Sequence, residues 1–160
     1  MTDTASDARC LRTCAVTLLA VLAVLAGGCT TNAPPPLAGK VRTDPATITR
    51  EFPQLGRVVE AHWRAGPLGV ADDRAPGPTD QLVEAALRLT PADLARLAGH
   101  YHFAPAGPPQ PPAELAPFLA GNGVWSASDG LDRDTGAPRW FGTVRIRLDT
   151  GVAYLRATTH

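Results

Sequence analysis

The strongest structural constraint in the sequence lies near its C-terminal end, where polar and apolar residues alternate. In the segment 140–148, Val144, Ile146 and Leu148 point to one side of an extended chain, and the arginines between them point to the other. A second apolar segment, 152–156, follows after a short connection that contains Asp-Thr-Gly. Because glycine can adopt a positive φ in such a connection, the pattern predicts an antiparallel hairpin over residues 139–157.

Two earlier segments, 57–64 and 81–89, also show the two-residue period of half-buried strands. In the first of them, Val59, Ala61 and Trp63 share one face, and Trp63 is a predicted core residue. The second segment also fits a helix, because some of its apolar residues recur at helical spacing. The strand is favoured, because a better helix start follows it directly.

That helix start is Thr90, which offers an N-cap before a proline and an acidic residue at the third position. It predicts a helix over residues 91–98 that stops at Gly99. A second short helix is predicted over 112–119, and residues 126–138 are predicted as a polar loop. The order strand, strand, helix, strand, strand indicates an α+β fold, with a small antiparallel sheet of about four strands and one or two short helices.

The N-terminal region carries an apolar run, residues 15–26, preceded by Arg9 and Arg12. The run is 12 residues long, whereas a membrane-spanning helix needs about 20. It falls in the range of about 7–15 residues that is typical of the core of a signal peptide. Two small glycines and Cys29 follow it, so residues 1–28 are predicted to be a removable signal peptide.

The five residues Leu25-Ala26-Gly27-Gly28-Cys29 resemble the lipobox of bacterial lipoproteins. The family usually has leucine three residues before the cysteine, and here that position is Ala26, with Leu25 one place too early. The resemblance implies that Cys29 receives a diacylglyceryl thioether and becomes the mature N-terminus, anchored in membrane lipid on the extracytoplasmic face. Ordinary signal cleavage nearby, which would give a secreted protein, is the alternative. The chain has one lysine, Lys40, and 14 arginines, and in this composition it resembles actinobacterial lipoproteins.

Three regions are therefore expected along the chain. Residues 1–28 form the signal peptide, 29–53 the lipidated cysteine with a Pro-containing tether, and 54–160 a single small α+β domain. Three consecutive prolines, residues 34–36, favour an extended tether of about 3.1 Å per residue. All three cysteines lie at or before Cys29, so the predicted domain contains neither a disulfide nor a cysteine-ligated metal.

The composition of the chain argues against two classes of function, nucleic-acid binding and serine hydrolysis. Fifteen basic residues balance fifteen acidic ones, which gives no electrostatic basis for nucleic-acid binding. After removal of the signal peptide the only serines are Ser126 and Ser128, without the Gly-x-Ser-x-Gly pattern of a hydrolase nucleophile. The chain is expected to be a non-catalytic lipoprotein without a cofactor, which binds an unidentified envelope protein or ligand.

Two groups of residues support the alternative, a small envelope hydrolase or a metal-binding protein. Imidazoles at His62, His100 and His102 could supply nitrogen ligands to zinc or act in catalysis. A calcium ion prefers several oxygen ligands from a flexible loop, which the predicted loop carries at Asp129, Asp132 and Asp134. The spacing of these carboxylates does not match an EF-hand, however, and solvated side chains are the favoured interpretation of both groups.

Positive charge is concentrated on the predicted C-terminal hairpin. Its arginines are interpreted as the solvated face of a two-faced sheet, and contact with anionic headgroups is the alternative. The residues concerned are Arg139, Arg145, Arg147 and Arg156.

Overall fold

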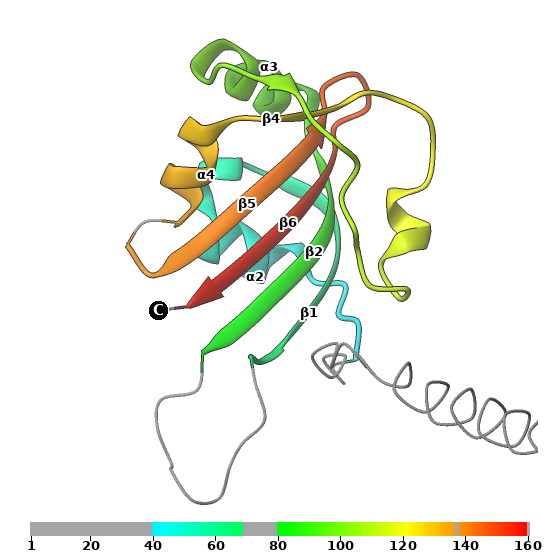
Figure 1. Cartoon of the computed structure of the whole chain (residues 1–160), viewed down its shortest axis with the longest axis vertical. Coiled ribbons are helices and arrows are strands. Elements are labelled where there is room, and N and C mark those ends of the chain that lie inside the picture. The colour runs from blue at the N-terminus through cyan, green and yellow to red at the C-terminus, as the bar shows by residue number, and fades with distance from the viewer. Residues whose placement is uncertain (1–39, 69–79, 137, 160) are drawn as a thin grey trace, which may run out of the picture. The chain divides into compact units, whose positions relative to one another are not determined.

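The computed structural model describes residues 40–68, 80–136 and 138–159. The predicted signal peptide over 1–28, Cys29 and the first part of the predicted tether lie outside the described residues. The described residues form one antiparallel sheet accompanied by three α-helices (Figure 1). None of the helices in these ranges is long and apolar enough to cross a membrane.

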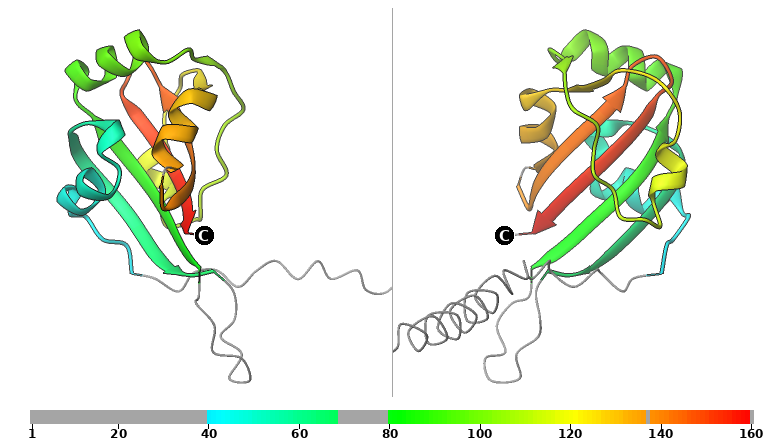
Figure 2. Two further views of the ribbon diagram at one scale, coloured as in Figure 1. Left: turned by 90° about the vertical axis from the view of Figure 1, so that its left-hand side faces the viewer. Right: turned by 45° about the vertical axis from the view of Figure 1, so that its right-hand side comes forward.

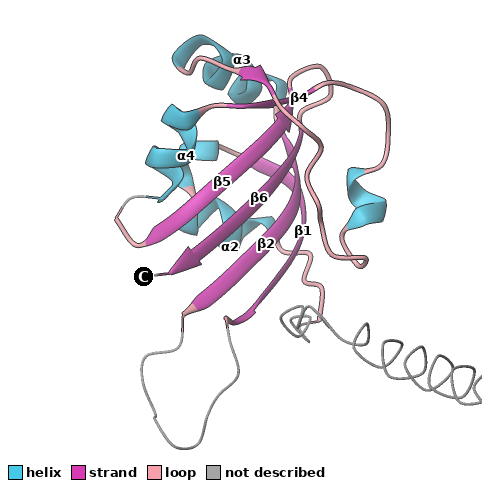
Figure 3. Cartoon of the chain, viewed as in Figure 1, coloured by secondary structure: helices cyan, strands magenta, loops and turns pink. Residues whose placement is uncertain are grey.

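The sheet has six strands in the order β1-β2-β6-β5-β4-β3, and all neighbouring strands are antiparallel. Their bounds are β1 Val58–Pro67, β2 Gln81–Leu89, β3 Ala104–Pro105, β4 Trp125–Ala127, β5 Trp140–Arg147 and β6 Val152–Thr159. The four predicted strands correspond to β1, β2, β5 and β6. The predicted fold class, a small sheet of about four strands, is wrong, because β3 and β4 extend the sheet beyond β5 (Figure 3).

The two faces of the sheet are covered differently. One face packs against α2 (Pro45–Glu51), the 3-10 helix η1 (Pro53–Leu55), α3 (Pro91–His100) and α4 (Asp129–Gly136), which together enclose the main hydrophobic cluster. The segment between β3 and β4 lies on the opposite face, where its leucines form a second cluster with β2 and β6. Figure 2 shows α2 on one side of the sheet and this segment on the other.

The predicted core residues are buried. Val144 and Ile146 of β5 are fully enclosed, and Trp63 of β1 is 4% exposed. Val59, which the alternation placed on the same face as Trp63, is instead 52% exposed, and Val58 is buried. The strand register shifts between Val58 and Glu60, and such a bulge moves the preceding side chains to the other face of the sheet.

The folded domain begins earlier than predicted, because part of the segment 29–53 forms α2. The carboxylate of Asp44 caps this helix, and Pro45 occupies its first position, where a missing N–H has no cost. Ile48 and Phe52 are each 1% exposed in the main cluster. The predicted tether therefore includes a helix of the domain.

Two other segments differ from prediction. The predicted helix over 112–119 is wrong, since only a short 3-10 helix, η2 (Ala116–Leu119), forms there. Pro117 lacks an N–H donor, and its ring would clash with the preceding turn of an α-helix. The predicted polar loop over 126–138 is also wrong, because it contains the last two residues of β4 and the whole of α4.

The N-cap of α3 is confirmed. The Thr90 hydroxyl accepts a hydrogen bond from the Asp93 N–H at 3.1 Å and donates one to the Asp93 carboxylate at 2.7 Å. That hydroxyl, with help from the N–H of Arg57 and from Arg96, lowers the pKa of Asp93 against the opposing effect of burial. The helix ends at His100, two residues beyond the predicted end.

We expect Thr90→Ala to lower the free energy of unfolding by about 1 kcal/mol, because the cap is lost. The pKa of Asp93 should rise toward its ordinary value, as measured by NMR titration. A carboxyl group with a lowered folded-state pKa stabilises the fold above its unfolded-state pKa, and this contribution is lost as the pH falls through the folded-state value. The variant should therefore lose less stability than the parent on acidification below about pH 4. Thr90→Ser retains the hydroxyl and should behave like the parent; equal effects of both substitutions would contradict the assignment.

Candidate functional site

The face of the sheet opposite the main cluster carries polar side chains from four strands. Cross-strand pairing places Glu84 of β2 between Arg64 of β1 and Arg156 of β6. We call this the polar face, and its members are Glu60, His62, Arg64, Glu84, Arg88, Thr143, Arg145, Arg147, Tyr154 and Arg156.

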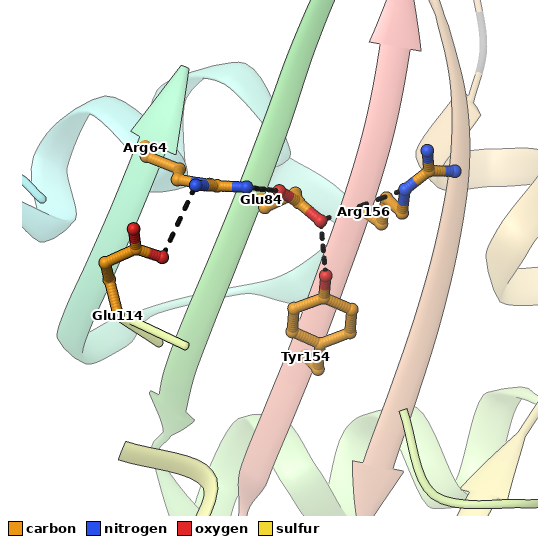
Figure 4. A network of polar contacts seen from close by, with 5 residues as sticks. All are labelled: Arg64, Glu84, Glu114, Tyr154 and Arg156. Carbon is orange, nitrogen blue, oxygen red and sulfur yellow. Dashed lines mark hydrogen bonds and ion pairs between the residues drawn. The ribbon is translucent and has the colours of Figure 1, made fainter. Parts of the chain in front are cut away.

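A buried ion pair lies at the centre of the polar face. Arg64 donates from Nε and Nη2 to the same oxygen of Glu84, at 3.0 and 2.8 Å. The Tyr154 hydroxyl donates to the other carboxylate oxygen at 2.7 Å (Figure 4). The Arg64 and Glu84 side chains are only 6% and 8% exposed. Since removing two charges from water is costly, these hydrogen bonds are what makes the buried pair tolerable.

The network reaches the surface at both ends. Glu114 lies 3.5 Å from Arg64 Nη1, and Arg156 Nε lies 3.9 Å from Glu84. The Glu114 and Arg156 side chains are about half exposed. Burial, together with the hydrogen bond to Glu84 and its negative charge, raises the pKa of Tyr154 well above its ordinary value. Tyr154 is therefore a permanent donor to Glu84, and Arg156, at the exposed end of the network, lines a pocket.

That pocket, which we call the cationic pocket, lies between β5, β6 and the proline-rich segment after β3. It has a volume of about 460 Å³. Arg145 and Arg156 supply its charge, and its lining residues are Gly107, Pro108, Pro109, Gln110, Thr143, Arg145, Tyr154 and Arg156. Arginine is suited to carboxylates and phosphates, because its planar group donates two parallel hydrogen bonds.

A second depression, the apolar groove, runs between α4 and the strands β5 and β6. It has a volume of about 730 Å³ and is lined by Asp132, Arg133, Gly136, Pro138, Trp140, Phe141, Gly142, Thr143, Arg156 and Thr158. Phe141 is 65% exposed here. Thr143 and Arg156 line both depressions, so the cationic pocket and the apolar groove are neighbours on one surface. Volumes of about 300–1,000 Å³ are typical of ligand pockets.

Asp132 of α4 stabilises the wall of the apolar groove. Its carboxylate accepts a hydrogen bond from the Val144 N–H at 2.7 Å and lies 3.7 Å from Arg145 Nη1. Burial raises the pKa of Asp132, and the hydrogen bond from Val144 and the charge of Arg145 oppose that shift. The side chain binds a backbone donor on β5, where β5 extends beyond its short pairing with β4.

The predicted histidines do not form one site. His62 stacks on Phe118, with ring centroids 3.4 Å apart, and its Nε2 lies 3.0 Å from Glu60. His100 and His102 line a different pocket, beside the start of α4. The structure therefore separates His62 from the other two.

The pocket of His100 and His102 also includes Asp129 and Asp134. Asp134 accepts a hydrogen bond from the Tyr101 hydroxyl at 2.8 Å, which ties this carboxylate to the end of α3. Asp129, Asp132 and Asp134 are spread along α4 rather than gathered in a flexible loop. Within the described ranges, no three histidine, cysteine or acidic residues gather closely enough to hold a metal ion.

Arg147 is an important residue whose position the sequence pattern did not predict. The alternation places it on the solvated face of the hairpin, but it is 2% exposed. Its guanidinium lies 4.5 Å from the Trp125 ring centroid and donates to the backbone carbonyls of Leu119 and Asn122. Arg147 thus attaches the segment before β4 to the sheet.

Comparison with known proteins identifies no relative. No protein-family model, curated protein or solved structure matches the chain. The geometry of the cationic pocket and the apolar groove is therefore the main basis for a functional proposal.

Proposed function

We propose that this protein is a lipid-anchored, non-catalytic binding module on the extracytoplasmic face of a cell membrane. The observation that carries the binding role is the pair of adjoining depressions that share Thr143 of β5 and Arg156 of β6. Arg156 lies 3.9 Å from Glu84 of the buried ion network and lines both the cationic pocket and the apolar groove. Such a combination of apolar walls and a few fixed polar groups is typical of ligand sites.

Binding fits the geometry better than hydrolysis does. The His62 ring stacks on Phe118, and its Nε2 contacts the Glu60 carboxylate. In the pocket of His100 and His102, the Ser128 hydroxyl accepts the Leu131 N–H at 3.5 Å and so caps the start of α4. A nucleophilic serine would instead need an adjacent general base.

The proposed location rests on the lipobox-like residues 25–29. Lipidation of Cys29 would supply membrane affinity, since each buried CH₂ contributes about 0.8 kcal/mol and two acyl chains anchor stably where one does not. The folded domain would then carry the polar face outside the membrane.

We expect Cys29→Ala to abolish labelling by an azido-palmitate analogue in the native host and to release the protein from membranes or mislocalise it. Both effects follow from loss of the thiol that accepts the lipid. Cys10→Ala and Cys14→Ala are matched controls, because these thiols lie within the predicted signal peptide, and both variants should retain the label. Undiminished membrane retention of Cys29→Ala would count against anchoring through this thiol.

A further inference from the structure

We propose that the cationic pocket and the apolar groove together bind one long-chain carboxylic acid drawn from the adjacent membrane. Its carboxylate would lie between Arg145 and Arg156, and its hydrocarbon chain would follow the groove past Phe141. This inference rests on the proposed binding function and names the ligand of that same site.

Charge complementarity determines where the carboxylate of the ligand binds. Three arginines line the two depressions, Arg133, Arg145 and Arg156, whereas Asp132 is the one carboxylate among the lining residues. Asp132 is already engaged by Val144 and Arg145. Beneath the pocket, Glu84 is engaged by Arg64 and Tyr154. The lining is therefore cationic, and a ligand with a single negative charge would meet two guanidinium groups.

The chemistry of the neighbouring groove determines the rest of the ligand. Five of its lining residues are aromatic, proline or glycine: Gly136, Pro138, Trp140, Phe141 and Gly142. Among them Phe141 presents a largely exposed ring, and covering such an apolar surface is favourable. Because Arg156 and Thr143 line both depressions, a molecule with one charged end and one apolar end would occupy them together.

The position of the groove in the sheet favours a ligand from the membrane. Register places Gly66, Leu82, Thr158 and Phe141 in one row, next to the sheet end where β1 stops and β2 starts. The incoming chain pairs antiparallel with β1 through Arg42 and Trp63. Lys40 and Val41 therefore lie toward that same end of the sheet.

The distance between this end and an anchor at Cys29 is limited. Eleven residue steps separate Cys29 from Lys40, and each step spans at most about 3.6 Å. Lys40, the first described residue of the domain, would therefore stay within about 40 Å of the anchor. A ligand that partitions into the bilayer would be concentrated beside its site.

The test uses the full chain, as processed by its host, in phosphatidylcholine vesicles. The probe is a long-chain carboxylic acid that carries a photoreactive diazirine. We expect saturable labelling of peptides that contain residues 138–143 and 156–158. Unlabelled palmitic acid should displace the probe at least about tenfold better than hexadecanol, because the alcohol lacks the charge that the arginines bind.

Variants test each end of the site. Arg156→Gln should weaken displacement by palmitic acid about tenfold, and Phe141→Ser should remove most of the labelling. Arg88→Gln changes an arginine of the same face outside both depressions, and Val124→Ser changes an apolar residue that is 68% exposed elsewhere. Both of these controls should label like the parent.

Three results would overturn the inference. The first is unsaturable labelling that is equal in all variants, which would indicate partition into the bilayer. The second is equal displacement by palmitic acid and hexadecanol. The third is displacement by phosphatidylglycerol vesicles but not by palmitic acid, which would indicate contact with an anionic lipid surface. None of them bears on azido-palmitate labelling at Cys29, so the proposed anchoring is tested independently.

Discussion

Glu84→Leu is expected to lower the free energy of unfolding by about 3–5 kcal/mol, as measured by chemical denaturation. The substitution would leave the buried Arg64 guanidinium without its nearest carboxylate, with the half-exposed Glu114 3.5 Å away, and the Tyr154 hydroxyl without its acceptor. The expected loss of stability is large, because the buried arginine keeps its desolvation cost after its closest partner is removed.

Two further variants make this expectation specific. In Arg64→Met/Glu84→Leu both charges are absent, and most of the lost stability should return. Glu60→Gln removes an exposed carboxylate of the same face that pairs with Arg88, and it should cost less than about 1 kcal/mol. If Glu84→Leu cost no more than Glu60→Gln, the buried network described above would be refuted.

Ile146→Ala is expected to lower the free energy of unfolding by about 2–5 kcal/mol, which is the range for buried isoleucines that leave a cavity. Ile146 is fully buried within the main hydrophobic cluster, between the strand neighbours Ala153 and Ser126. Thermal or chemical unfolding of the purified variant measures the change.

The matched control is Val124→Ala, which shortens an aliphatic side chain that is 68% exposed. It should change the free energy of unfolding by no more than about 0.5 kcal/mol. Equal changes in the two variants would contradict the assignment of Ile146 to the covered face of β5.

The strands that the sequence predicted are those whose covered and polar faces alternate over eight or more residues. In β5 and β6 the alternation and the Asp-Thr-Gly connection agree, and Gly151 indeed adopts a positive φ of 70°. The start of α3 was predictable because Thr90 is a local signal, read within one turn. Both features depend on neighbours in the sequence.

The missed elements β3, β4 and α4 depend on distant partners. β3 and β4 have two and three residues, too few for a period to appear. In α4, polar residues and two glycines conceal the one large apolar anchor, Leu131, which is fully buried. A short segment of this kind becomes a helix because tertiary packing outweighs weak local propensity.

The candidate site was predictable only in part. The arginines of the C-terminal hairpin were identified, and Arg145 and Arg156 now line the cationic pocket. The burial of Glu84 and Arg147 was missed, because it arises when the segment between β3 and β4 covers one face of the sheet. Alternation shows which residues share a face, and it does not show which of them a distant loop will cover.

Intact-mass spectrometry of the protein processed in its native host tests the central claim, an acylated binding module, most directly. The account predicts a polypeptide that begins at Cys29 and carries the added mass of a diacylglyceryl group on that residue. An unmodified chain that begins at another residue, or a chain that retains Met1, would contradict it.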